Sequence, residues 1–447
     1  MLEAEGAGED PSQIPGATWD DDVRAWRVPA AAHEDVLVRC SDSRIRISDD
    51  VVPRRIAGAW ALPSLRWYQT RALAAWDAAH RRGVIALPTG SGKTLVALAA
   101  IANLGVGALV IVPTRVLLDQ WARALAAVCP QPIGRLGDGE HLLQPITVAT
   151  YASAVIWAPR IGDQFGIVVV DEAHHVGAWC PAEVLEMLPA AARLGLTATP
   201  PDEGGALERH VGPVVYSLGI DDLAGDALAP YELRTVPIML GRDERSRYRM
   251  LRSRFASVYA ELARRTGRGD WNDFMRIAAR SPEARDALEA WRSYRALIAY
   301  SEGKRAAVRE ILARHAGERA LVFTADNATA YTIARELLVM PVTHEITRTE
   351  RARVLAKFES GEISVLVSSQ VLDEGLDVPD ADLAIIVGGT ASARRHVQRI
   401  GRVLRPREGK HAIIYELAIG DTAEAGYVRR RRAGLSDRYR DAIGGVS

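Results

Sequence analysis

The chain has 447 residues and a balanced charge, with 56 Lys and Arg against 56 Asp and Glu, so its formal net charge is zero. A chain of this length is expected to form about three domains, and its 48% apolar and 25% charged residues are typical of a globular protein with sizeable cores. A neutral chain must hold any nucleic acid through local basic patches. The three cysteines lie far apart without a CxxC pair, which argues against a disulfide framework and against a zinc or iron–sulfur site.

The N-terminal segment is acidic and rich in turn residues, and residues 18–52 carry short β-branched runs broken by Pro, Asp and Ser. This pattern predicts a small strand-containing module over 1–62. No basic stretch followed by an apolar core opens the chain, so we expect no signal peptide. The longest apolar stretch, 95–113, contains Asn103 and several glycines, which favours a helix leading into a buried strand over a membrane span. We therefore predict a cytoplasmic protein that does not associate with membranes.

Apolar strands alternate with helical patterns over 63–238, in the segments GVIALP, ALVIVP, ITVAT, FGIVVVDE and LGLTATP. Such runs predict a parallel sheet covered by helices on both faces. The pattern over 239–303 is helical and rich in Arg and aromatic residues. A second alternation follows over 304–428, with RALVFTAD, ISVLVSS, ADLAIIVGG and HAIIYEL, and a basic tail occupies 429–447. The predicted fold is α/β, with two parallel-sheet lobes, a helical insertion and a small N-terminal module.

The segment LPTGSGKT, residues 87–94, has the pattern of a phosphate-binding loop between a strand and a helix. Its glycines allow backbone N–H groups to approach phosphate oxygens at a helix N-terminus. Lys93 is placed to reach the β- and γ-phosphates, and the Thr94 hydroxyl to bind Mg²⁺. Leu87 stands where the general pattern has Gly. The predicted nucleotide-binding residues of this loop are Pro88, Thr89, Gly90, Ser91, Gly92, Lys93 and Thr94.

Two adjacent acids end the strand in FGIVVVDE. Asp171 is expected to hold Mg²⁺ through its water shell, and Glu172 to orient or deprotonate the attacking water. Asp commonly ends strands, so the pair alone could mark a plain strand terminus. Following a phosphate-binding loop, it indicates nucleotide hydrolysis.

The sequence DEAH at 171–174, after GSGKT, resembles the superfamily 2 helicases and suggests a DEAH-box helicase, and further matches follow in that superfamily's motif order. The resemblance covers about Leu65 to Leu417, interrupted by the helical insertion. It implies two tandem RecA-like lobes that hydrolyse ATP between them. Closing and opening of the two lobes during hydrolysis would then move two strand-binding surfaces, which makes translocation possible.

The resemblance also implies roles for residues of the first lobe. LRWYQTRAL resembles the adenine-side motif, in which Gln69 reads the base and Arg66 stacks on it. LTATP resembles motif III, in which Thr197 and Thr199 couple the two sites, and His174 is expected to link motif II to the other lobe. VPTRVLLDQW resembles motif Ia and TVATYAS the next strand-contacting motif. Together these two imply nucleic-acid contacts by Pro113, Thr114, Arg115, Thr150, Tyr151 and Ser153.

In the second lobe, LVFTAD resembles motif IV and SSQVLDEGLDVP resembles motif V. Motif V implies that Ser369 lies toward the nucleic acid and that Gly375 and Asp377 lie toward the nucleotide. The segment HVQRIGRVLRP resembles motif VI. The catalytic residues that it implies are Gln398 on the γ-phosphate side and the arginine fingers Arg402 and Arg405.

Within the superfamily, the chain is most similar to the XPB branch of repair- and transcription-associated DNA translocases. The similarity lies in IGRLGDGE, the Leu87 variant of the phosphate loop, VGPVVYSLGIDDLAGDALAPYEL and the helical insertion. That branch carries an N-terminal module resembling a damage-recognition domain, a helical thumb and an Arg-Glu-Asp loop after motif III. Here the corresponding loop reads PPDEGGALERH, without the triplet, so unwinding and translocation without unwinding both stay open.

The resemblance predicts an ATP-dependent, Mg²⁺-dependent DNA helicase or translocase in repair or related DNA processing. Its expected partners are single-stranded or duplex DNA and a nuclease or repair protein. An RNA-directed enzyme of the same superfamily is one alternative. A nucleic-acid-stimulated ATPase that remodels protein–DNA complexes without unwinding is the other.

The insertion interleaves arginines with aromatic residues. We predict that Phe255, Trp271, Phe274 and Trp291 pack in a helical core, because large apolar side chains are usually buried. The arginines are equally consistent with phosphate contacts and with a solvated face. The run at 429–432 could also contact phosphates, but a charge run is usually a solvated face. The arginines of the insertion that we consider are Arg242, Arg245, Arg247, Arg249, Arg252 and Arg254.

Overall fold

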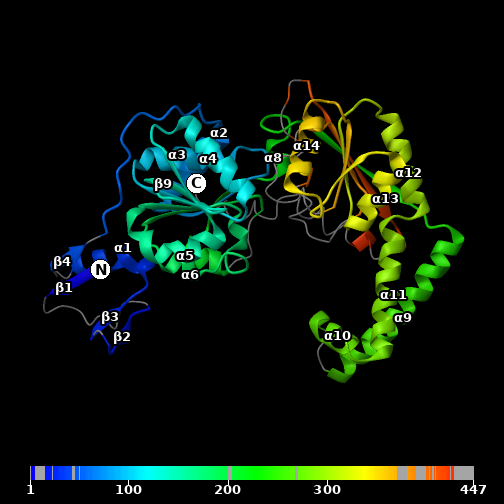
Figure 1. Ribbon diagram of the computed structural model, residues 1–447, viewed down its shortest axis with the longest axis horizontal. Helices are drawn as coiled ribbons and strands as arrows, with labels where there is room; N and C mark the ends of the chain where they lie inside the picture. The colour runs from blue at the N-terminus through cyan, green and yellow to red at the C-terminus, as the bar shows by residue number, and fades with distance from the viewer. Residues whose placement is uncertain are drawn as a thin grey trace, which may run out of the picture. The chain divides into compact units, whose positions relative to one another are not determined.

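The computed structural model divides into two compact units, with the division between Asp222 and Leu223, and each unit is built on a parallel sheet (Figure 1). The structure describes residues 2–5, 16–22, 24–42, 46–49, 51–199, 204–266, 270–369, 380–388, 399–401, 403–404, 407, 409–422 and 424–426. The sequence pattern places the end of the first lobe at residue 238. In the structure β13 (Tyr231–Ile238) pairs with a strand of the second sheet, so the second unit begins earlier.

The N-terminal segment contains short antiparallel strand pairs, in keeping with its β-branched runs. Strand β1 pairs with β4, and β2 with β3. The rings of Trp19 and Trp26 contact edge to face across the second pair, with centroids 5.7 Å apart. The elements of this segment are β1 (Leu2–Glu5), β2 (Thr18–Asp20), β3 (Ala25–Arg27), α1 (His33–Asp42) and β4 (Arg46–Asp49).

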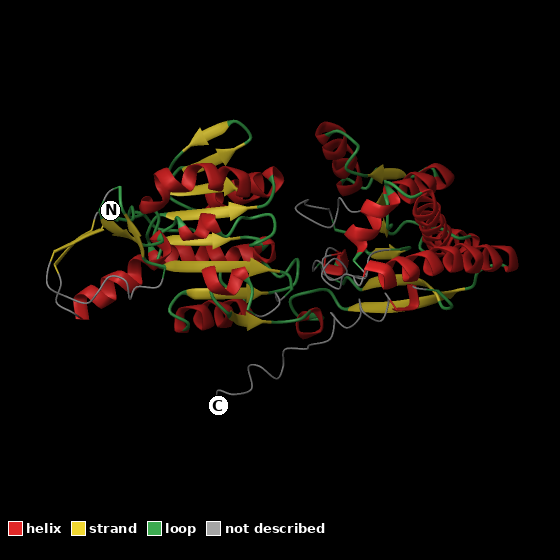
Figure 2. Cartoon of the chain, turned by 90° about the horizontal axis from the view of Figure 1, so that it is seen from below, coloured by secondary structure: helices red, strands yellow, loops and turns green. Residues whose placement is uncertain are grey.

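Among the described residues of the first unit, eight strands form one sheet (Figure 2). All neighbouring strands pair in parallel except the last two, which form an antiparallel edge pair. Strands β6, β9, β10 and β11 are buried at every position, as expected for a parallel sheet covered on both faces. The spatial order is β12 (Val214–Ser217), β5 (Arg82–Ala86), β11 (Ala192–Thr197), β10 (Ile167–Val170), β6 (Ala108–Val112), β9 (Ile146–Thr150), β7 (Ile133–Gly137) and β8 (Glu140–Leu142).

This strand order decides which motifs become neighbours. Loops that follow parallel strands meet at the carboxyl edge of the sheet. Across β5, β11, β10, β6 and β9, that edge presents the phosphate loop, motif III, motif II, motif Ia and the next strand-contacting motif in turn. The helices of this unit are α2 (Trp67–Ala78), α3 (Lys93–Leu104), α4 (Arg115–Val128), α5 (Tyr151–Ile161), α6 (Glu183–Glu186) and α7 (Ala206–His210), with α8 (Ile220–Leu223) at the boundary.

The second unit contains a six-stranded parallel sheet within its described residues. A buried ion pair joins the start of α12 to Glu424. There the Lys304 Nζ donates to Glu424 Oε1 at 2.6 Å and to the Ile298 carbonyl at 2.7 Å. The order is β13, β18 (Ala412–Ile419), β17 (Leu383–Ile386), β14 (Ala320–Phe323), β16 (Val365–Ser368) and β15 (Met340–Val342), with helices α12 (Glu302–Arg314), α13 (Asn327–Leu337) and α14 (Arg348–Glu359).

The insertion forms a helical arm made of α9 (Arg242–Thr266), α10 (Trp271–Ala278) and α11 (Pro282–Ala299). Figure 1 shows α9 and α11 side by side, with α10 at their far end. The aromatic residues of the arm pack against one another, which confirms the predicted helical core. The rings of Phe255 and Phe274 have centroids 5.7 Å apart, and those of Trp271 and Trp291 are 4.7 Å apart. Within the part of the chain that the structure describes, no helix is both long and apolar enough to cross a membrane.

Candidate nucleotide and nucleic-acid site

The phosphate loop joins β5 to the first residue of α3, as the sequence predicts. Gly90 and Gly92 adopt left-handed backbone angles, with φ of 88° and 79°, which side chains other than glycine rarely tolerate. A Cβ atom added to Gly92 would lie 2.6 Å from the Gln69 Nε2. Both glycines are therefore required by the backbone conformation, and one of them also by a close neighbour.

Lys93 is the first residue of α3, and its ammonium group points back into the loop. The Nζ donates to the Leu87 carbonyl at 2.9 Å and to the Pro88 carbonyl at 3.3 Å. Thr94 follows as the second residue of the helix and is half-buried. The positive charge is thus held at a helix N-terminus, where backbone N–H groups also favour an anion.

Helix α2 holds the phosphate loop through the residues of the adenine-side motif. The Gln69 Nε2 donates to the Ser91 carbonyl at 3.0 Å and to the Gly92 carbonyl at 3.3 Å, and the Tyr68 hydroxyl donates to the same Ser91 carbonyl at 2.6 Å. The Gln69 Oε1 accepts the Arg66 backbone N–H at 2.9 Å, while the Arg66 side chain is exposed. Gln69 is thus placed as a support of the loop, a role that sequence reasoning missed. Base reading by Gln69 and stacking by Arg66 stay predictions.

Asp171 follows β10 and is buried, and both of its carboxylate oxygens accept hydrogen bonds. The Trp121 Nε1 donates to Oδ2 at 2.7 Å, and the Glu172 backbone N–H donates to Oδ1 at 2.9 Å. Burial raises the pKa of the Asp171 carboxyl above its usual range. These two hydrogen bonds and the charge of Lys93 act against that rise without reversing it. Glu172 itself has a left-handed backbone with φ of 47°.

Tyr151 does not occupy the position that the sequence predicted for it. We expected a nucleic-acid contact, but the side chain is only 4% exposed. Its hydroxyl donates to the Asp171 carbonyl at 2.5 Å and to the Glu172 carbonyl at 3.1 Å. The correction follows from its place at the start of α5, where the ring packs under the turn that carries the two acids.

The other predicted nucleic-acid residues of this unit lie at the N-termini of α4 and α5. Thr114 caps α4 by accepting the Leu117 N–H at 3.3 Å, and Thr150 caps α5 by accepting the Ser153 N–H at 3.2 Å. Arg115 is exposed and forms an ion pair with Asp138. The two threonines thus have structural roles as caps. The exposed Arg115 and the half-buried Pro113 and Ser153 stay candidates for contact.

The coupling residues connect motif II to motif III within the first unit. The His174 Nδ1 lies 3.2 Å from the Thr197 Oγ1 and 3.4 Å from the Glu172 carboxylate. The Thr197 hydroxyl donates to the Thr199 carbonyl at 2.9 Å. A contact of His174 with the other lobe was the expectation. The structure shows His174 bonded to motif III of its own lobe, and its contact with the other lobe stays a prediction.

In the second unit, Ser369 is 1% exposed and its hydroxyl donates to the Asn327 Oδ1 at 2.5 Å. The predicted nucleic-acid contact by Ser369 is thus corrected, because its side chain is bonded inside the unit. Its carbonyl also accepts the Arg399 Nη2 at 3.0 Å. The remaining predicted residues of this unit lie outside the described residues: Gly375, Asp377, Gln398, Arg402 and Arg405.

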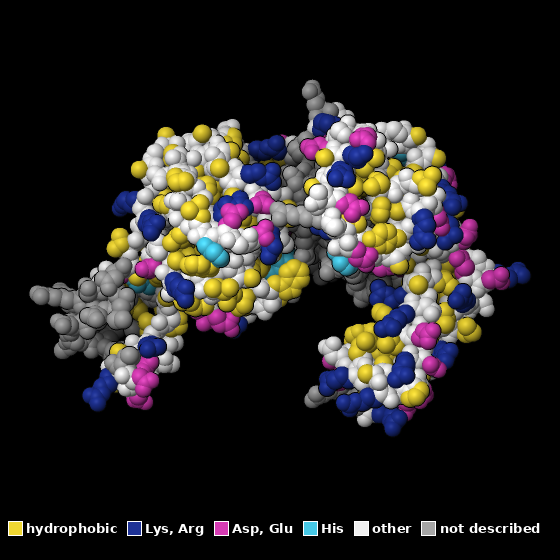
Figure 3. Space-filling model, viewed as in Figure 1, with side chains coloured by type: hydrophobic (Ala, Val, Ile, Leu, Met, Phe, Trp, Pro, Cys, Tyr) yellow, Lys and Arg dark blue, Asp and Glu magenta, His cyan; other side chains and the backbone are white. Residues whose placement is uncertain are grey.

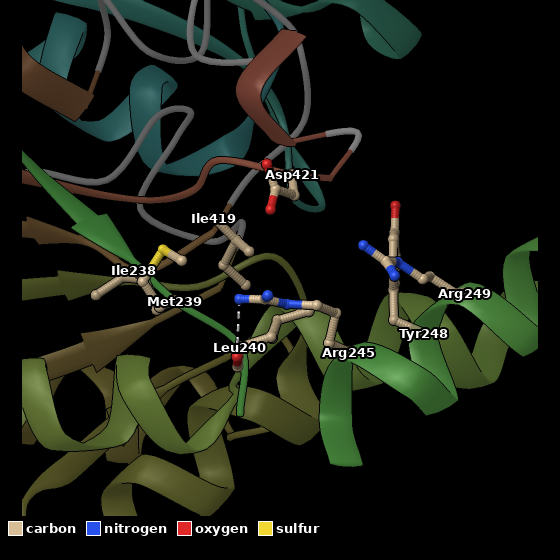
Figure 4. Close-up of a pocket in the computed structure, with 8 residues that line it drawn as sticks. All are labelled: Ile238, Met239, Leu240, Arg245, Tyr248, Arg249, Ile419 and Asp421. Carbon is tan, nitrogen blue, oxygen red and sulfur yellow. Dashed lines mark hydrogen bonds between the residues drawn. The ribbon is translucent and has the colours of Figure 1, made fainter. Parts of the chain in front are cut away.

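A pocket lies at the root of the helical arm, in the second unit (Figure 4). Arg245 reaches across it and donates to the Leu240 carbonyl at 3.4 Å. The arginines of the arm gather on its exposed faces (Figure 3). One of them, Arg254, pairs with Asp286 at 2.9 Å, and both side chains are more than half exposed. Exposed pairs of this kind contribute little to stability.

The acidic and hydroxyl groups near the phosphate loop fit magnesium bound together with a nucleotide. Among the residues that the structure describes, no cluster of three or more His, Cys, Asp or Glu side chains could hold a metal ion alone. Magnesium on a nucleotide needs only one or two protein ligands, since phosphates and water supply the rest. Asp171 and Thr94 are the residues of this unit that suit such a role.

Two family models match the chain. The model described as "Type III restriction enzyme, res subunit" matches residues 62–202, and the model described as "Helicase conserved C-terminal domain" matches 303–407. The first match covers most of the first sheet and the second covers β14 to β17 of the second sheet, and the helical arm lies between the two matched ranges. The second description names the class of protein that the ordered motifs predicted, and the first names a restriction-enzyme subunit.

The chain is also similar to curated proteins along most of its length. It is 35% identical to "DNA 3'-5' translocase XPB2" of Sulfurisphaera tokodaii, over 94% of this chain and 96% of that protein. It is 31% identical to "DNA 3'-5' helicase XPB" of Mycobacterium tuberculosis, over 80% of this chain and 61% of that protein. It is 27% identical to the XPB/SSL2 subunit of general transcription and DNA repair factor IIH of Saccharomyces cerevisiae, over 84% of this chain and 44% of that protein. The chain thus spans nearly all of one relative and about half of another.

Two solved structures share the fold. The Hef helicase domain of Pyrococcus furiosus superposes with a TM-score of 0.55 at 21% identity, covering 82% of this chain and 97% of that one. Dbp5 of S. cerevisiae superposes with a TM-score of 0.54 at 16% identity, covering 83% and 88%. These similarities confirm the predicted α/β fold with RecA-like parallel sheets.

Proposed function

The chain belongs to the XPB-type family of superfamily 2 DNA helicases and translocases, and from this premise we propose that it is an ATP-driven motor on DNA. The observation that carries the proposal is the hydrogen-bonded arrangement of the phosphate loop, motif II and motif III along one sheet edge. We propose repair- or transcription-related DNA processing as its setting, with 3′–5′ movement, because its relatives are named for that direction.

Family membership corrects one finer prediction. The four residues at 171–174 suggested the DEAH-box subclass, but XPB-type proteins form a different branch of superfamily 2. Four residues at one strand end are shared too easily to define a subclass. The similarity to XPB-type relatives extends over most of the chain.

For the nucleotide site, we propose that the N–H groups of the loop and the Lys93 ammonium bind the phosphates of ATP. Mg²⁺, when bound, would neutralise phosphate charge, with Asp171 and Thr94 as its protein ligands. Glu172, beside Asp171, would hold and deprotonate the attacking water. From motif VI, Gln398 and the arginine fingers Arg402 and Arg405 are proposed to complete the catalytic set.

For the nucleic-acid site, we propose that DNA lies along the N-termini of α4 and α5. Backbone N–H groups at helix N-termini bind phosphates well, and Arg115 is exposed at the first of them. The arginines of the helical arm are proposed as a second set of phosphate contacts, which would make binding weaken with salt. A nuclease or repair protein is proposed as the partner that directs the motor.

The test is steady-state ATP hydrolysis without nucleic acid and then with single-stranded DNA, duplex DNA or RNA. Stimulation by DNA that is lost in Lys93→Ala and Arg405→Ala is the expected result. Stimulation by RNA alone would contradict a DNA motor. Strand separation and triplex displacement, measured side by side, distinguish unwinding from translocation without unwinding.

A further inference from the structure

The turn that carries Asp171 and Glu172 is held by two aromatic donors from different helices. Trp121 of α4 donates its indole N–H to the Asp171 carboxylate at 2.7 Å. Tyr151 of α5 donates its hydroxyl to the Asp171 carbonyl at 2.5 Å and to the Glu172 carbonyl at 3.1 Å. Neither contact follows from the family motifs, and the two helices are otherwise candidates for binding nucleic acid.

Both donors are buried, which makes their hydrogen bonds effective. Trp121 is 2% exposed, and it lies on the apolar face of α4 with Leu118 and Leu125. A hydrogen bond to a carboxylate is stronger than a neutral one, and the low polarity of the surroundings strengthens it further. With Oδ2 bonded to the indole and Oδ1 to the Glu172 N–H, the carboxylate plane of Asp171 is fixed.

Tyr151 acts on the backbone of the same turn. Glu172 has a positive φ of 47°, a conformation that residues other than glycine adopt only when the surroundings enforce it. The Tyr151 hydroxyl contacts the carbonyls on both sides of the Glu172 backbone N–H. Its bonds therefore stabilise the left-handed backbone conformation of Glu172 directly after Asp171.

The helices that carry these donors also carry the candidate nucleic-acid residues. Trp121 lies six positions after Arg115, a rise of about 9 Å along α4, and Tyr151 directly follows the cap residue Thr150. Strands β10, β6 and β9 are consecutive neighbours in the sheet. A shift of α4 or α5 would therefore move a donor that contacts the motif II turn.

We propose that Trp121 and Tyr151 are positioning residues that set the geometry of the motif II turn and make it depend on the helices facing DNA. DNA bound at the N-termini of α4 and α5 thereby favours the hydrolytic geometry of Asp171 and Glu172. This inference rests on the proposed function, because it presupposes a nucleotide with Mg²⁺ at Asp171. It adds a second route between the two sites, beside the bonds of His174 with motif III.

The test uses the full chain with Trp121→Phe and Tyr151→Phe, which remove one donor each and keep most of the buried ring. Trp76→Phe is the matched control for the indole, because the Trp76 Nε1 is also buried and donates to the Arg193 carbonyl at 2.9 Å. Tyr331→Phe, which loses a hydroxyl bonded to Thr343, is the control for the phenol. The measurements are the affinity for fluorescent ADP in EDTA and across a Mg²⁺ titration, and ATP hydrolysis with and without duplex DNA.

We expect Trp121→Phe to lower the Mg²⁺-dependent gain in nucleotide affinity by about 10- to 100-fold, as residues that orient a metal ligand typically do. Its affinity in EDTA should equal that of the wild type. Tyr151→Phe should lower the same gain by about 2- to 10-fold, the effect of one neutral hydrogen bond. Both variants should lose most of the stimulation by DNA, whereas the two control variants keep it.

The inference would be overturned if Trp121→Phe and Tyr151→Phe showed the same nucleotide affinities and the same ATP hydrolysis as their control variants. Equal losses of affinity with and without Mg²⁺ would also overturn it, because they indicate a general structural defect. Thermal unfolding identifies a Trp121 variant that does not fold, and Tyr151→Phe, which removes a single oxygen, then decides. Failure of the proposed function looks different, since the wild type itself would then show no nucleotide binding or no response to DNA.

Discussion

Gln69 supports the phosphate loop in this structure, and this predicts a specific outcome for Gln69→Ala. The substitution removes three hydrogen bonds, two from Nε2 to the Ser91 and Gly92 carbonyls and one from the Arg66 N–H to Oε1. Each neutral hydrogen bond contributes about 0.5–1.5 kcal/mol net. The Ser91 carbonyl keeps its bond from Tyr68, and the other two groups lie on exposed residues where water can replace the amide.

We therefore expect a loss nearer to that of one or two bonds than of three, about 1–2 kcal/mol in loop organisation. If the nucleotide binds only the organised loop, its affinity falls by about 5- to 30-fold, since about 1.4 kcal/mol corresponds to tenfold. The assay is titration with fluorescent analogues of ADP and GDP. The matched control is Gln131→Ala, whose amide also donates to a backbone carbonyl, that of Ala57 at 3.1 Å, but far along the chain from the loop.

The comparison of the two bases separates support from base reading. A residue that supports the loop affects the phosphates, so both nucleotides should lose affinity by the same factor. A loss confined to the adenine nucleotide would refute the reasoning and establish the base contact that the adenine-side motif implies. An unchanged affinity for both would show that Tyr68 alone suffices to hold the loop.

Three further outcomes are expected. Lys93→Ala should lower DNA-stimulated ATP turnover by about 10²–10³-fold with an unchanged circular dichroism spectrum, and appreciable turnover in this variant would contradict the assigned site. Glu424→Gln should lower the free energy of unfolding by about 3–5 kcal/mol, because it leaves the Lys304 ammonium buried without its charged partner. Denaturant titration measures this loss. The double variant Lys304→Met with Glu424→Leu should recover most of it. Burial raises the pKa of the Cys180 thiol from 9.0 to about 12. The thiol therefore ionises first in the unfolded chain, and the free energy of unfolding falls as the pH rises between those two values. Native Cys180 should accordingly resist pulse alkylation at about pH 9, where an ordinary thiol reacts, and rapid labelling followed by peptide mass spectrometry would count against its burial.

The sequence by itself determined the local features of this protein. Apolar runs bounded by turn residues predicted β5, β6, β9, β10 and β11 of the first sheet and β14, β16, β17 and β18 of the second. The glycine spacing predicted a phosphate-binding loop, and the structure shows left-handed backbone angles, which glycine allows, at Gly90 and Gly92. Such features depend on residues within a few positions of one another, so a local pattern is enough to specify them.

Only the tertiary structure decided which of these features meet. The apolar pattern of α4 implies a buried Trp121, and a buried indole N–H needs an acceptor, but its acceptor, Asp171, lies 50 positions away, directly after β10. Tyr151 and Ser369 sit in motifs that imply contact with nucleic acid, yet both are buried and bonded inside their own units. The assignment of β13 to the second sheet is likewise a matter of pairing with β18. The order of strands in a sheet and the direction of a side chain at a helix start depend on long-range packing. The spacing of neighbouring residues in the sequence therefore predicts neither of them.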